Sequence, residues 1–164
     1  MKVSKQYLQV PADLLRSPAY TALNIHEIKT LRRIEIEHVE HGGKDNGRLP
    51  VTHADIKRHG VGHKYVTPSQ RVLEGLGLIE CTDRGRAGTG EFRKPNLWRL
   101  TYISTKSAAG WVEPTHEWAK IETPAEADQI ARKFRYRETR TNRPPPRRKP
   151  KLRVVQSETP IDAG

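Results

Sequence analysis

The segment 63–77 carries a dense group of hydrogen-bonding side chains. If the segment is helical, the spacing i, i+3, i+4 and i+7 puts Lys64, Thr67, Pro68 and Arg71 on one side. His63 and Gln70 lie at the margins of that side. Arginine can donate two hydrogen bonds to guanine, glutamine can pair with adenine, and threonine offers a methyl group to thymine. This side therefore has the chemistry to read base edges in a DNA groove. An ordinary solvated helix face is the alternative.

A second group of cations surrounds the glycine-rich stretch RGRAGTGEFRK, residues 84–94. Its basic members are Arg84, Arg86, Arg93 and Lys94. Glycine allows a sharp hairpin, and arginine exposed at such a tip can contact phosphates or enter a minor groove. As a nucleotide-binding motif the stretch is weak, because it lacks the Lys-Ser/Thr pair of a P-loop and does not open a helix. A plain solvated hairpin is the alternative.

A third group of cations lies near the C-terminus. Residues 132–153 hold eleven lysines and arginines against the single acidic residue Glu138. We expect contacts to phosphates, without groove specificity, from five of these side chains: Arg143, Arg147, Arg148, Lys149 and Lys151. Since prolines prevent a helix and apolar residues are few, we expect 142–164 to be a disordered basic tail.

Other residue groups indicate catalysis or metal binding only weakly. Two His-Glu pairs, at 26–27 and 116–117, begin like the helical zinc-protease motif but lack its second histidine. His38 and His41 share a helix face, where solvated histidines are the more common case. The sole cysteine, Cys81, excludes an internal disulfide and a zinc site built on several thiolates. We therefore expect a binding protein and not an enzyme, with no cofactor and no metal.

Local signals place two helices before these groups. Ser17, followed by proline, begins a short helix within 11–23. Asn24 begins a longer one, with Glu27 at the spacing of a capping box, and Gly42 ends it. The apolar residues of the longer helix fall within an arc of about 140°, which we expect to face the core. They are Ile25, Ile28, Leu31, Ile36 and Val39.

Shorter elements follow. Pro50 limits 48–51 to a short edge strand, and Thr52 with Asp55 begins a second short helix that ends at Gly60. After the third helix, at 63–77, come a strand, a hairpin tip and a returning strand at 78–82, 84–90 and 96–102.

Pro68 interrupts the third helix. A proline in a continuous helix clashes with the carbonyl group four residues earlier, here that of Lys64. Either the regular helix begins with Thr67 as its N-cap, or 63–67 forms a looser turn.

The sequence HGVGHKYVTPSQRVLEGLGLIECTDRGRAGTGEFRKPNLWRLTY, residues 59–102, resembles the recognition-helix and wing half of a winged helix-turn-helix DNA-binding domain. Within it, VLEGLGLIE resembles the stretch where the recognition helix of many bacterial regulators ends and the first wing strand begins. The resemblance covers residues 14–102. It implies an α+β fold, with a three-helix core and a small antiparallel β-wing.

The resemblance also implies a function. The third helix would lie in the major groove of double-stranded DNA, and the arginine-rich wing would contact the flanking backbone or minor groove. We expect a sequence-specific transcriptional regulator. A replication-initiation or mobile-element protein is the alternative within DNA binding, and a protein- or RNA-binding adaptor is the alternative outside it.

Composition agrees with a nucleic-acid partner. A formal net charge of +11 favours a polyanionic partner. The length of 164 residues favours one compact domain with an appendage. The expected parts are an N-terminal arm, the winged-helix domain, a linker, a C-terminal helix and the tail: 1–13, 14–102, 103–122, 123–141 and 142–164.

The apolar residues near the C-terminus form a pattern typical of a docking helix. The helix has a narrow apolar stripe, which we expect to dock on the domain; pairing of two copies is the alternative. The stripe consists of Ala127, Ile130, Ala131 and Phe134. No apolar run is long enough for a membrane span or a signal peptide. We expect a cytoplasmic, nucleoid-associated protein with no membrane partner and no small-molecule effector.

Overall fold

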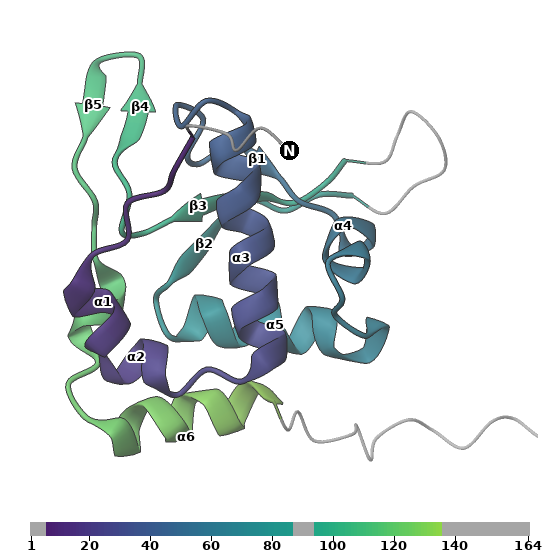
Figure 1. Ribbon diagram of the computed structural model, residues 1–164, viewed down its shortest axis with the longest axis vertical. Coiled ribbons are helices and arrows are strands. Elements are labelled where there is room, and N and C mark those ends of the chain that lie inside the picture. Colours follow the sequence, from purple (N-terminus) through teal and green to yellow (C-terminus); the bar gives the residue numbers. More distant parts are fainter. Residues whose placement is uncertain (1–5, 87–93, 136–164) are drawn as a thin grey trace, which may run out of the picture.

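The computed structural model describes residues 6–86 and 94–135, which form an α+β fold (Figure 1). Its helices are α1 (Ala12–Arg16), α2 (Pro18–Thr21), α3 (Ile25–Glu40), α4 (His53–Arg58), α5 (His63–Gly75), the 3-10 helix η2 (Glu117–Lys120) and α6 (Pro124–Arg135). Its strands are β1 (Leu49–Pro50), β2 (Ile79–Asp83), β3 (Leu97–Leu100), β4 (Thr105–Ser107) and β5 (Gly110–Val112).

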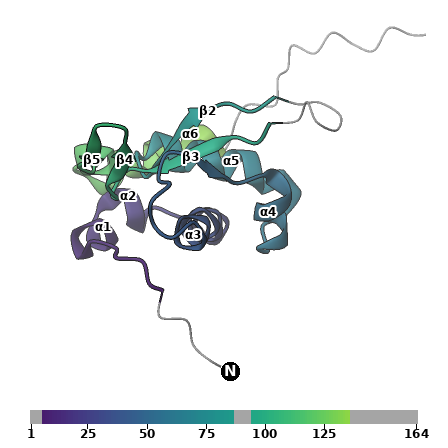
Figure 2. The same ribbon diagram turned by 90° about the horizontal axis from the view of Figure 1, so that it is seen from above.

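The strands form two antiparallel sheets. One has the order β1-β3-β2, and β4 pairs with β5 in the other. In the first sheet Trp98 lies opposite both Leu49 and Cys81, and the Trp98 side chain is buried. Seen from above, α3 and β2 lie on opposite sides of the molecule (Figure 2), and α5 contacts both of them.

The helix starts predicted from the sequence are confirmed. The Ser17 side chain accepts a hydrogen bond from the Tyr20 backbone N–H at 3.2 Å, at the start of α2. Both partners of the capping box are present at Asn24 of α3, and the same motif begins α4 at Thr52. These caps depend on residues three positions apart, so local sequence is sufficient to specify them.

The buried side of α3 is not the arc predicted from its apolar residues. Ile25 and Ile36 of that arc are 58% and 39% exposed. Leu31 of that arc is buried as predicted; the other buried residues of the helix are Glu27, Thr30, Ile34, Glu35, Glu37 and His38. The prediction was wrong because the carboxylates have partners: Glu27 binds Arg135 and Glu35 accepts from Tyr102.

Helix α5 runs unbroken through Pro68, so neither alternative for the proline is correct. The helix begins after Gly62 rather than at Thr67. Val66 and Ser69, on either side of the proline, are 0% and 2% exposed. Packing against the core therefore holds both sides of the proline in one helix, although Pro68 has no N–H to donate to Lys64.

The strands after α5 agree with the prediction within a few residues. The expected strand 78–82 corresponds to β2 (Ile79–Asp83), and the expected strand 96–102 corresponds to β3 (Leu97–Leu100). The two strands are joined across the base of their loop, where Lys94 donates its backbone N–H to the Arg86 carbonyl at 3.3 Å. The tip of the expected hairpin and Arg93 lie outside the described residues.

Residues 103–122, expected to be a linker, contain β4, β5 and η2. Trp118 and Ile121 are 8% and 7% exposed and belong to the same hydrophobic core as Trp98. Large apolar side chains such as these are usually buried, but they are too widely spaced in 103–122 to form a pattern that predicts an element of the core.

Helix α6 docks on α5 and α2, as predicted for its apolar stripe. Ala127 and Ala131 are fully buried, and Ile130 and Phe134 pack against the core. Of the expected helix and tail, 136–141 and 142–164 lie outside the described residues. Within the described residues, no helix combines the length and apolar character needed to cross a membrane.

Candidate nucleic-acid interface

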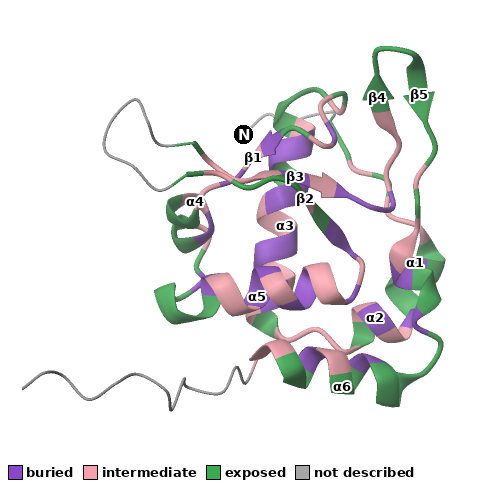
Figure 3. Cartoon of the chain, turned by 180° about the vertical axis from the view of Figure 1, so that it is seen from behind, coloured by how far each residue is buried: buried purple, intermediate pink, exposed green. Residues whose placement is uncertain are grey.

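The candidate interface is the outer side of α5, next to the base of the β2–β3 loop. Seen from behind, α5 lies between the sheet and α6, and much of its visible side is partly exposed (Figure 3). A contact joins the two elements: Arg84 Nη2, just after β2, lies 3.2 Å from Glu74 Oε1 in the last turn of α5. The cationic loop base and the outer side of α5 are therefore neighbours.

Four of the side chains predicted on α5 lie toward solvent to different degrees. His63 and Lys64 are exposed in the first turn, whereas Thr67 and Arg71 are half-buried. The first turn therefore offers the most accessible groups of this helix.

Gln70 is a correction to the predicted set, because it is only 4% exposed. It lies four residues after Val66 and three before Leu73, both fully buried. Helical periodicity therefore places Gln70 in the core-facing stripe and not at the margin of the outer side. Its Nε2 atom has no hydrogen-bond partner within the described residues.

Glu74 adds a negative charge that the sequence analysis did not consider. It follows Thr67 and Arg71 at i+7 and i+3, and so shares their side of α5. Its carboxylate pairs with Arg84, whose side chain is 73% exposed. An ion pair this exposed contributes little to stability, but it reduces the charge that Arg84 presents to a polyanion.

The loop base carries the other described cations of the predicted set. Arg86 and Lys94 are exposed and line an open pocket of about 400 Å³ beside the first turn of α4, next to His53. Gly85 donates its N–H to the Asn96 side chain at 2.9 Å, which holds the two arms of the loop together. This arrangement places Arg86 and Lys94 next to α4, whereas Arg84 contacts α5.

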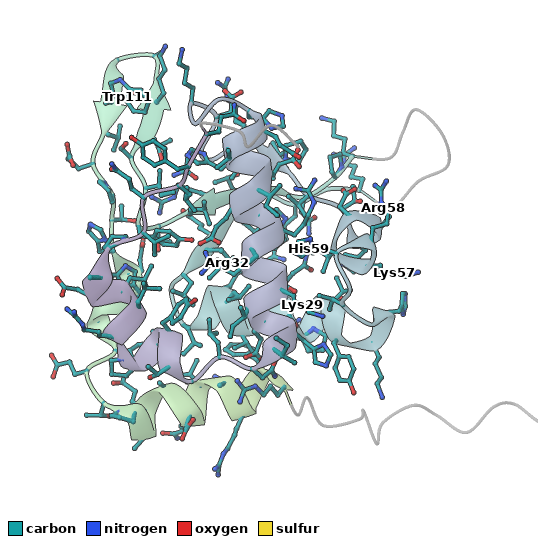
Figure 4. The ribbon with its side chains drawn as sticks, viewed as in Figure 1. Lys29, Arg32, Lys57, Arg58, His59 and Trp111 are labelled. Carbon is teal, nitrogen blue, oxygen red and sulfur yellow. The ribbon has the colours of Figure 1, made fainter. Side chains whose placement is uncertain are left out.

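Helix α4 contributes basic side chains that the sequence analysis missed. Lys57 and Arg58 are exposed, and Lys29 of α3 reaches the Gly60 carbonyl at 3.5 Å (Figure 4). Burial opposes the ionisation of Asp55, but hydrogen bonds from Thr52 and Arg58 outweigh it and lower the Asp55 pKa. The run KRH that ends this short helix was the available signal.

Aromatic stacking fixes the start of α5 against α3. The rings of His26 and Tyr65 lie 4.0 Å apart and nearly parallel, and Lys64 Nζ lies 4.8 Å from the Tyr65 centroid. Arg135 of α6 then binds Glu27 in the first turn of α3, at 2.6 and 2.7 Å. The stack on α3 thus fixes the start of α5, where Lys64 lies beside the Tyr65 ring.

The remaining perturbed groups serve structure. Burial raises the pKa of Glu35 and raises that of Tyr102 well above its usual value; the two share a hydrogen bond inside the core. Burial also raises the pKa of the Cys81 thiol, which donates to the Asp83 carbonyl at 3.4 Å. A protonated thiol is a poor nucleophile.

The described residues include histidines, a cysteine and carboxylates, which are potential metal ligands. No cluster of three or more histidine, cysteine, aspartate or glutamate side chains there has the arrangement needed to hold a metal ion.

Three comparisons with known proteins were without a match. No family model matches the chain, and neither the curated proteins nor the solved structures contain a match.

Proposed function

We propose that this protein binds double-stranded DNA sequence-specifically through a winged-helix arrangement, as a transcriptional regulator. Helix α5 would enter the major groove, and the β2–β3 loop would contact the flanking backbone or minor groove. The observation that carries the proposal is the contact of Arg84 with Glu74, which brings the cationic loop base beside the outer side of α5. The element order α3, β1, α4, α5, β2 and β3 supports it.

The exposed fractions of the side chains suggest different roles for α5 and the loop base in this interface. His63 and Lys64, in the exposed first turn of α5, meet the DNA first, and Thr67 and Arg71 follow along the same side. Arg84, Arg86 and Lys94 neutralise phosphates, which positions the domain without reading sequence. Phosphate contacts release counterions, so affinity falls steeply with salt.

Glu74 favours a reading mode in which the first turn of α5 does most of the base contact. A carboxylate facing a duplex is repelled unless it stays paired. Glu74 stays paired by occupying Arg84, so the pair offers phosphates no net positive charge at the last turn of α5. A replication-initiation or mobile-element protein would use the same interface.

A protein-binding adaptor is the second candidate function. Trp111 and Val112 of the β4–β5 hairpin are 57% and 49% exposed, which favours a protein partner on that side.

The test is a mobility shift of the full chain on random duplex DNA across a salt series. Lys94→Ala is expected to reduce the slope of log affinity against log salt by about 0.9, the value for one phosphate contact. Lys106→Ala is the matched control, because Lys106 is also an exposed lysine but lies on β4, away from α5. Absence of any shift at low salt would contradict DNA binding and favour the adaptor.

Sequence specificity needs a separate experiment. Selection of bound sequences from a random duplex library is expected to enrich one motif, and Arg71→Ala should then cost about 1–3 kcal/mol on that motif if Arg71 contacts guanine. A library that remains random after selection would reduce the proposal to non-specific binding.

A further inference from the structure

A groove lies between the N-terminal segment and the β4–β5 hairpin, away from the candidate interface. Its walls come from residues 6–11 and from β5, and its floor from the end of α3 and residues 102–104. The N-terminal segment runs between the top of α3 and the hairpin (Figure 1). The groove is open and has a volume of about 950 Å³.

Two exposed aromatic side chains line this groove. Trp111 is 57% exposed and Tyr7 is 77% exposed, whereas Trp98 and Trp118 are almost fully buried. Trp111 stands on the hairpin, far from the labelled basic side chains of α4 (Figure 4). Aromatic rings of this kind, apolar over their faces, are typical of surfaces that bind a partner.

The charge of the groove contrasts with that of the chain. Among the described residues that line it, Glu113 carries a negative charge and none is lysine or arginine. His38, 4% exposed, lies at its floor, and its Nδ1 atom has no hydrogen-bond partner in the described part of the chain. Burial is the main cause of a lowered His38 pKa, so this side chain adds no cation near neutral pH. The groove therefore suits a ligand with apolar and basic side chains.

The chain itself contains such a ligand. Residues 143–151, RPPPRRKPK, hold four prolines and five basic residues. Proline-rich segments dock on aromatic grooves because the fixed proline φ lowers the entropy lost on binding. We propose that residues 143–151 dock in this groove, with prolines against Trp111 and Tyr7 and a basic side chain on Glu113.

The described end of the chain and the floor of the groove lie at opposite ends of α3. Arg135 binds Glu27 in the first turn of α3, and His38 lies eleven residues further along the same helix. At 1.5 Å per residue the two positions are about 17 Å apart along the axis. The seven residues 136–142 can span roughly 23 Å when extended. The axial separation along α3 therefore lies within the span of residues 136–142.

Tethering makes even a weak contact effective. A segment on a short linker has an effective concentration in the mM range, so a site with a dissociation constant of about 1 mM is occupied roughly half of the time. Occupancy at that level should shield Trp111 measurably. The inference goes beyond DNA binding and does not depend on it.

Acrylamide quenching of tryptophan fluorescence in the full chain tests the proposal. Trp98 and Trp118 are buried, so the quenching slope reports mainly on Trp111, and Trp111→Phe should abolish most of it. Replacing Pro144, Pro145 and Pro146 together by serine keeps the charge. This triple variant is expected to raise the quenching slope by up to about twofold, because Trp111 goes from shielded half of the time to always accessible.

Glu113→Gln should raise the slope in the same direction, whereas Pro160→Ser, in the same tail but outside the segment, should leave it unchanged. A triple-serine variant that is quenched like the parent would overturn the proposal. A slope that rises on dilution of the parent protein would also overturn it, because the segment would then come from a second copy.

Discussion

At the scale of single residues, buried carboxylates of α3 bind side chains from distant parts of the chain. Glu27, 1% exposed, accepts hydrogen bonds from the Asn24 backbone and side chain and from the Arg135 guanidinium. Glu35, 4% exposed, accepts from the Tyr102 hydroxyl and pairs with Arg32. A buried carboxylate without such partners would be costly.

Arg135→Ala is expected to destabilise the fold by about 3 kcal/mol, because it leaves the Glu27 carboxylate buried without its cation. Arg132→Ala is the matched control: Arg132 is an exposed arginine of the same helix, and its loss should cost less than about 0.5 kcal/mol. Urea unfolding measures both free energies. Adding Glu27→Gln to Arg135→Ala should recover part of the loss. Equal stability of the two single variants would show that the pair does not hold α6 in place.

At the scale of elements, the segment after β3 closes the molecule against the end of α5. Thr115 and His116 donate their backbone N–H groups to the Thr101 carbonyl, both at 3.0 Å. Gly77, which has a φ of +69°, lies so close to η2 that an added Cβ would come within 2.7 Å of the Glu117 carbonyl carbon and 2.8 Å of the Trp118 nitrogen. Glycine at this position permits both the turn and the contact.

Gly77→Ala should therefore combine backbone strain with displacement of η2. Gly42→Ala is the matched control, since Gly42 has a similar φ of +66° but no atom within 4 Å of an added Cβ. The control should cost about 1 kcal/mol from left-handed strain alone, and Gly77→Ala should cost at least about 1 kcal/mol more. Thermal unfolding of both variants gives the comparison. Indistinguishable midpoints would show that η2 can move away at little cost.

At the scale of the whole molecule, cations and exposed aromatics occupy different regions. Lys57, Arg58 and the loop base lie at the edge formed by α4, while Trp111 lies on the hairpin at the opposite edge (Figure 4). The chain has 30 lysines and arginines against 19 acidic residues, so its field attracts polyanions from a distance. Duplex DNA and residues 143–151 would therefore be bound at different surfaces, and the segment contacts phosphates only while it is out of the groove.

Deleting residues 142–164 is expected to lower affinity for duplex DNA by a similar factor on every sequence and to reduce the salt slope. The reason is that the five basic residues of 143–151 neutralise phosphates without reading bases. Titrations of full-length and shortened chain at several salt concentrations provide the measurement. The same slope for both chains would mean that the tail makes no phosphate contact.

The sequence by itself determined the elements whose signals are local. N-caps at Ser17, Asn24 and Thr52 lie where their spacing predicted, and Gly42 follows the end of α3. The β2–β3 hairpin and the docking of α6 by its apolar stripe were also predicted. These features depend on residues three or four positions apart or on one amphipathic pattern, so neighbours in sequence are sufficient to encode them.

Tertiary structure alone decided which sides of the helices are buried. Glu27 is buried because Arg135, 108 residues away, supplies its cation, and Glu35 is buried because the Tyr102 hydroxyl, 67 residues away, donates to it. Likewise Trp118 joins the core because the chain folds back onto the end of α5. These partners of the two carboxylates lie far along the chain, so no local pattern contains them.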